Sequence, residues 1–133
     1  NISYWTLVYV DETDELAIER AKPHLRHAFT KVFFTGEEAV LRNAERREAR
    51  GEHLGATIAR NLPNPDYLID HQLVFVGSPK KVAADIRQAA EEGMFNTLLA
   101  ELNFGTMAEE DLQRSIKLFG TEVLPALRGF QPY

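Results

Sequence analysis

The sequence contains no cysteine among its 133 residues. This absence excludes a disulfide-stabilised scaffold, a thiolate metal site and a cysteine nucleophile. It fits a reducing compartment, and we expect a cytoplasmic protein. The length suffices for one domain with a core of its own, and a hydrophobic content of 44% excludes wholesale disorder.

Long apolar runs and an excess of basic residues are also missing. The longest apolar stretches, such as residues 73–76, cover only a few positions, so no segment is long enough to span a bilayer. Fifteen basic residues against twenty acidic ones give a net charge of −5, which argues against a nucleic-acid-binding surface. We therefore expect neither membrane nor nucleic acid as a partner. The start has no signal-peptide pattern and no initiator methionine, so we expect a segment upstream.

The first 30 residues predict a strand followed by a helix. Residues 3–10 are β-branched, aromatic and apolar, which is typical of a strand buried on both faces of a parallel sheet. The acidic cluster at 11–14 favours a helix start, and the apolar spacing that follows predicts a helix over about 15–29. Pro23 lies inside that helix and predicts a kink or a break.

A charged segment of about residues 33–70 interrupts the regular pattern. Its helical part alternates arginine with glutamate and offers few positions for a core, which indicates an insertion facing solvent. Either it is an exposed surface helix, or it forms a mobile lid over a site.

The remaining chain alternates short apolar strands with amphipathic helices. We expect strands at 73–76 and 97–100, a helix at 80–92, and a last helix that begins at a capping box of Thr106 and Glu109. Pro125 predicts a kink or restart late in that last helix. Because strands that alternate with helices form right-handed crossovers, the sequence predicts an α/β fold with a parallel sheet.

In such a fold, ligands bind where the strands end. Glu101 ends an apolar strand, where a partly desolvated carboxylate suits a general acid or base or a ligand contact; an ion pair with a nearby arginine is the alternative. Asn103 either contacts a ligand or turns the loop. Trp5 and Leu7 share one face of the first strand, where Trp5 either stacks on a planar ligand or packs in the core.

The turn at Gly77 and Ser78 and the four histidines are two further places where a ligand could bind. Gly77 and Ser78 precede Pro79 in a turn that either receives an anion at a helix N-terminus or caps that helix. The four histidines form no recognised ligand set, so we predict no metal site.

The order of these motifs resembles the C-terminal end of the luciferase-like flavin-dependent monooxygenases, the family of bacterial luciferase. The residues that carry the resemblance are 8–17, the turn at 75–82, Gly93, 96–99, 103–105, 114–115, 118–119 and the Glu-Val-Leu-Pro-Ala-Leu-Arg run at 122–128. The resemblance implies part of a TIM (β/α)8 barrel, namely about strands 6–8 and their helices, with residues 33–70 as an insertion. A complete barrel needs about 250 residues, so the barrel would be incomplete in this chain, either truncated or completed by a partner.

The resemblance also implies a function. Reduced FMN, supplied by a separate flavin reductase, would activate oxygen to oxidise a small organic substrate, in a protein that forms homo-oligomers. A deazaflavin-dependent oxidoreductase and a non-catalytic flavin-binding or dimerisation module are the alternatives. Relatives that oxidise sulfonates carry Arg and His where Trp5 and Leu7 stand here, which favours an apolar or aromatic substrate. For this function we expect Glu101 to be catalytic and Trp5, Leu7 and Asn103 to contact the substrate. The general rule for barrels points to Gly77 and Ser78 as cofactor contacts, whereas many relatives hold the flavin phosphate on loops from earlier strands.

Overall fold

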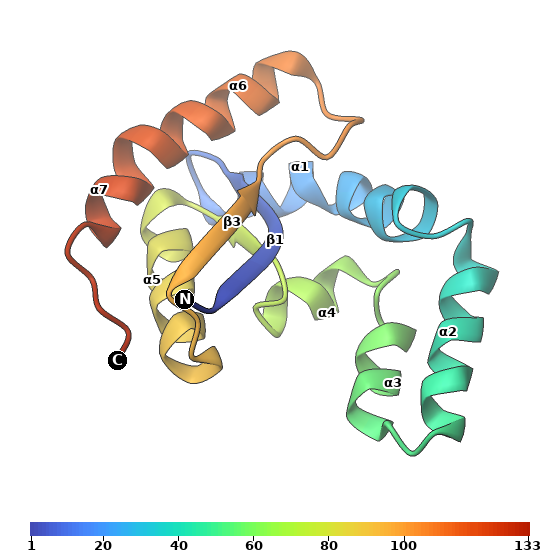
Figure 1. Ribbon diagram of the computed structural model, residues 1–133. Helices are drawn as coiled ribbons and strands as arrows, with labels where there is room; N and C mark the ends of the chain where they lie inside the picture. The colour runs from blue at the N-terminus through green and yellow to red at the C-terminus, as the bar shows by residue number, and fades with distance from the viewer.

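A computed structural model describes residues 1–133, and its centre is a sheet of three parallel strands (Figure 1). The strands are β1 (Ser3–Val10), β2 (Phe75–Gly77) and β3 (Thr97–Glu101), in the spatial order β2-β1-β3. The short strand β2 pairs with the C-terminal half of β1, whereas β3 pairs with the N-terminal and middle part of β1. The predicted parallel α/β fold is confirmed.

Helices surround this sheet and account for most of the remaining chain (Figure 1). No helix is both long enough and apolar enough to cross a membrane. The helices are α1 (Asp14–His27), α2 (Glu37–Ala49), α3 (His53–Arg60), α4 (Pro65–Asp70), α5 (Pro79–Gly93), α6 (Glu109–Leu118) and α7 (Leu124–Leu127), with π-helical turns η1 (Ala28–Val32) and η2 (Phe119–Val123).

Two hydrophobic clusters lie on opposite faces of the sheet. Because side chains alternate along a strand, Leu7 and Tyr9 pack against α1 and α4 on one face, while Val8 and Val10 face α5 and η2 on the other. All four side chains are at most 1% exposed. Strand β1 is therefore the buried central strand of a three-layer arrangement, as its continuous apolar sequence predicts.

The strand order does not confirm the predicted barrel segment. In a (β/α)8 barrel consecutive strands neighbour one another and all helices lie outside, so β2 would stand between β1 and β3. Here β1 is in the middle, helices cover both faces of the sheet, and the sheet is open. The barrel segment was predicted from the order of motifs along the chain. That order indicates which elements form, but it does not determine which strands become neighbours.

Helix α1 begins as predicted but is not broken at its proline. The Thr13 hydroxyl accepts a hydrogen bond from the amide of Leu16 and caps the helix. The helix continues through Pro23 and passes directly into η1. The predicted break is wrong, because Pro23 lacks only one amide donor while Ala21 and Leu25 on either side are fully buried and hold the helix in place.

The charged insertion folds as a helical arm with a boundary earlier than predicted. Helices α2 and α3 form a hairpin that projects from the sheet (Figure 1), with Val40, Ala44, Ala56 and Ala59 buried in it and outside the two main clusters. Helix α4, also placed in the insertion by the sequence, instead contributes Leu68 and Ile69 to the core. The solvated segment therefore ends before α4.

The capping box predicted for the last helix does not form. Ala108 is the N-cap of α6 and makes no side-chain capping hydrogen bond. The Thr106 hydroxyl is instead 2.7 Å from Nδ1 of His24 on α1. The kink or restart predicted at Pro125 falls where the helix type changes, because α6 passes through the π-helical turn η2 into α7 without an interruption.

Candidate functional site

A cavity of about 210 Å³ lies beside β1 and β3, on the face of the sheet that α1 covers. The helices that follow β1 and β3 lie on opposite faces of the sheet. Open α/β folds bind ligands beside the carboxyl ends of two neighbouring strands of this kind. Eight residues line the cavity: Trp5, Leu7, Ala28, Val32, Phe33, Glu101, Asn103 and Phe104.

Four of the site residues predicted from sequence meet at this cavity. Trp5 and Leu7 come from β1, Glu101 is the last residue of β3, and Asn103 lies two residues farther on. The strand register explains this convergence, since Leu7 stands opposite Glu101 in the pairing of β1 with β3. The rule that sites gather where strands end predicts Glu101 and Asn103, whereas Trp5 and Leu7 were predicted from their shared face of β1 and from the family resemblance.

Aromatic side chains form the outer wall of the cavity. The rings of Trp5 and Phe33 are 5.4 Å apart at an angle of 78°, and Phe29 adds a second edge-to-face contact to Phe33 at 5.2 Å. Phe29 lies within the π-helical turn η1, and Phe33 directly follows that turn. Trp5 remains 47% exposed, so it does not pack in the core, and the stacking on a planar ligand that the sequence offered as its other role stays a prediction.

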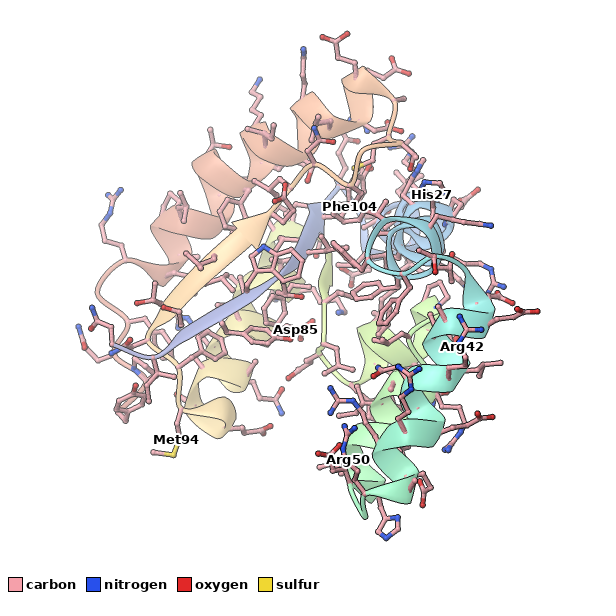
Figure 2. All side chains as sticks on the ribbon, turned by 45° about the vertical axis from the view of Figure 1, so that its right-hand side comes forward. His27, Arg42, Arg50, Asp85, Met94 and Phe104 are labelled. Atoms are coloured by element: carbon pink, nitrogen blue, oxygen red, sulfur yellow. The ribbon has the colours of Figure 1, made fainter.

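Phe104 closes the inner side of the cavity. It is buried and belongs to the cluster formed with α1 and α4. Figure 2 shows Phe104 beside the ends of the strands, facing the end of α1 that His27 marks, whereas Arg42 and Arg50 lie on the α2–α3 arm away from the sheet. The arginine-rich arm therefore does not supply charge to this cavity.

Glu101 is a carboxylate without a partner in the protein. The alternative predicted for it was an ion pair with an arginine, but the eleven ion pairs of the structure do not include it. The side chain is partly exposed, which is why it remains tolerable without a counter-ion. Asn103 does turn its loop, because its Oδ1 accepts a hydrogen bond from the Gly105 amide at 2.9 Å.

Gly77 and Ser78 lie outside this cavity, at the start of α5. The Ser78 hydroxyl caps α5 through the Lys81 amide, and the Ser78 amide donates to Oδ1 of Asp14 at 2.7 Å. This amide holds the pKa of Asp14 below its usual value, so a carboxylate already occupies the position where an anion would bind. The residues therefore fit the capping alternative and do not fit a cofactor phosphate.

A charge network at the end of β1 was not identified from the sequence. The Asp11 carboxylate is fully buried and accepts hydrogen bonds from the Tyr9 hydroxyl at 2.7 Å and the Glu12 amide at 2.8 Å. It also pairs with Arg20 of α1 at 2.9 Å and with Arg114 of α6 at 3.4 Å. Asp11 therefore connects the central strand to a helix on each side of it.

The protonation of this network follows from its contacts. Burial alone would raise the pKa of Asp11, but hydrogen bonds from Arg20, Tyr9 and the Glu12 amide outweigh it and hold the pKa below its usual value. Burial and the adjacent Asp11 carboxylate raise the pKa of Tyr9 far above its usual value. Both arginines are committed to carboxylates, because Arg114 also pairs with Asp111 at 2.9 Å. The network is thus neutralised internally and is structural.

A larger hollow of about 450 Å³ lies at the opposite end of the sheet, lined by Tyr4, Leu73 and Phe95 among others. It sits where the strands begin, and the Tyr4 hydroxyl there donates to the Leu73 carbonyl at 2.8 Å. The Tyr4 hydroxyl is thus already used within the fold, and the ligand-binding rule for open sheets selects the other end. No group of three or more histidine, aspartate or glutamate residues is placed to hold a metal ion.

Comparisons with known proteins add no family to these observations. No family model matches the chain, and no curated protein matches its sequence.

Proposed function

We propose that this chain is part of a flavin-dependent monooxygenase that uses reduced FMN and oxygen to oxidise a small organic substrate. The observation that carries the proposal is the convergence of Trp5, Leu7, Glu101 and Asn103 on one cavity. Strand position predicts Glu101 and Asn103, the family resemblance predicts Trp5 and Leu7, and all four line the same cavity. The lining suits an apolar or aromatic substrate, because six of its eight residues are hydrophobic.

Each lining residue has a distinct part in this proposal. Trp5, Phe33 and Leu7 would exclude water from the substrate and hold its apolar body. Glu101 would accept a hydrogen bond or a proton from a donor on the substrate. The side-chain amide of Asn103 has free donors beside that carboxylate, because its hydrogen bond to Gly105 uses the oxygen.

The cofactor would supply the oxygen chemistry when bound. The cavity volume of about 210 Å³ lies below the roughly 300 Å³ at which drug-sized pockets begin, so it matches a single small substrate rather than a whole flavin nucleotide. Gly77 and Ser78 do not fit the cofactor phosphate, as Asp14 occupies the α5 terminus. Neither the cavity nor the start of α5 therefore fits the flavin.

Oxygen labelling tests this function. The full-length protein that contains this chain is purified and mixed with NADPH, a flavin reductase, FMN, ¹⁸O₂ and a panel of small aromatic compounds, and products are analysed by mass spectrometry. We expect labelled product that requires the protein and reduced FMN, and that decreases in the Glu101→Gln variant. Failure of the protein to bind reduced FMN, together with no label in any compound, would refute the proposal. Substituting a reduced deazaflavin for FMN in a parallel reaction distinguishes the two cofactors.

The open edge of the sheet favours a second candidate, a binding or dimerisation module without turnover. Strand β3 pairs only with β1, and Leu99 in its middle is 51% exposed. Exposed strand edges of this kind associate with further chains, which is the basis for proposing a homo-oligomer. Flavin binding or dimerisation in light scattering without labelled product would favour this candidate, whereas labelled product excludes it.

A further inference from the structure

We propose that the cavity binds a small organic ammonium ion with an aromatic body. The proposal rests on the proposed function only in assigning the substrate to this cavity, and it specifies the substrate's charge. Aromatic side chains and one carboxylate are the features that proteins combine to bind organic cations, and Trp5, Phe33, Phe104 and Glu101 bring both to one cavity.

The charge of the cavity follows from its lining. Glu101 is the only ionisable residue among the eight lining residues, and no lysine, arginine or histidine is among them. The buried carboxylate of Asp11, by contrast, has Arg20 and Arg114 beside it. A ligand that enters the cavity thus meets an unpaired negative charge. An ammonium group gains a charge-assisted hydrogen bond there, whereas a carboxylate or sulfonate is repelled.

The aromatic wall adds to this preference. The indole of Trp5 meets the ring of Phe33 edge to face and remains 47% exposed, so part of its π-surface is free to contact a ligand. A cation over a tryptophan face is attracted by the negative face of the ring, and tryptophan is the strongest of the aromatic residues in this respect. The remaining wall, made by Leu7, Ala28 and Val32, is aliphatic and suits the ligand's apolar body.

Three matched probes test the inference. Benzylamine, which is a cation at neutral pH, benzyl alcohol, which is neutral, and benzoate, which is an anion, share one ring and differ in charge. Trp5 is the only tryptophan of these 133 residues and lines the cavity, so its fluorescence reports binding of each probe. We expect benzylamine to bind about tenfold more tightly than benzyl alcohol, and benzoate to bind more weakly than both.

Two variants assign the preference to the carboxylate. Glu101→Gln keeps the shape of the side chain and one acceptor oxygen, so it should weaken benzylamine binding by about tenfold and benzyl alcohol binding much less. Glu110→Gln removes an exposed carboxylate on α6, outside the cavity, and should change neither. Circular dichroism of both variants controls for folding. Equal binding of the three probes, absence of binding, or equal losses in both variants would overturn the inference. Turnover of neutral aromatics by a protein without ammonium preference would overturn it and leave the oxygenase proposal standing.

Discussion

Replacing Asp11 with asparagine should destabilise the fold by about 3 kcal/mol. Breaking a buried ion pair by removing one partner costs about 3–5 kcal/mol, because the remaining charge has lost its counter-ion. Here the arginines are only partly buried, with Arg20 keeping 37% and Arg114 28% of its side chain exposed. Water can re-solvate both after the substitution, so we expect a loss near the lower end, about 3 kcal/mol.

Urea unfolding measures this loss. Small domains lose roughly 2 kcal/mol of stability per molar urea, so the urea midpoint should fall by about 1.5 M. Circular dichroism and Trp5 fluorescence both report the unfolding transition. Asp111→Asn is the matched control, because Asp111 pairs with the same Arg114 but is 22% exposed and joins residues of one helix. Its loss should stay below about 1 kcal/mol. A loss at Asp11 below about 0.5 kcal/mol would refute the reasoning, since it falls within the range of ordinary surface substitutions.

The pH dependence supplies a second check on the same residue. Because the pKa of Asp11 is lower in the folded than in the unfolded protein, its charge stabilises the fold fully above the unfolded value of about 3.9. This contribution is lost as the pH falls through the folded value. The stability difference between wild type and Asp11→Asn should therefore be constant near neutral pH and shrink below about pH 4. A difference that persists unchanged at pH 2.5 would show that the charge is not its cause.

Three further predictions concern buried contacts. Ser115→Ala should cost about 1–3 kcal/mol in urea unfolding, because the Val10 amide loses its acceptor at 2.9 Å in a fully buried position. Carboxyl-carbon NMR titration should place the pKa of Asp14 below the usual aspartate value, and a Ser78→Pro change, which removes the donating amide, should return it toward that value. Leu25→Ala should cost about 2–5 kcal/mol, because Leu25 is fully buried in the cluster between α1 and the sheet.

Local structure was predictable from local pattern. Strand β1 was expected at residues 3–10 and lies at Ser3–Val10, while α5 was expected at 80–92 and lies at Pro79–Gly93. Both are bounded by strong signals, namely a continuous apolar run and a Ser-Pro start. The Thr106 cap was predicted wrongly because a hydroxyl can bond a residue distant in sequence, here His24. No spacing rule along the chain reveals that competition.

The arrangement of the strands and the Asp11 network were not predictable from the same patterns. Strand pairing depends on which edges the crossovers leave free, and the three-residue strand β2 carries little information about its neighbour. The sequence places Asp11 only in an acidic cluster that favours a helix start. Its partner Arg114 lies 103 residues away in the sequence, so only the folded chain shows the pair.

Asp11 and Glu101 both lie at the carboxyl ends of strands, but one has a structural role and the other is free to contact a ligand. Asp11 ends the central strand, is fully buried, and therefore requires the four hydrogen-bond donors that surround it, because an unpaired charge there would cost more than the domain's net stability allows. Glu101 ends the outer strand, is partly exposed, and tolerates the lack of a partner. The difference in burial decides their roles: a carboxylate that the fold has fully satisfied cannot serve a ligand, whereas Glu101 keeps its hydrogen-bonding capacity for one. The substitution that alters ligand preference without loss of stability should therefore be at Glu101, and the one that destabilises the fold should be at Asp11.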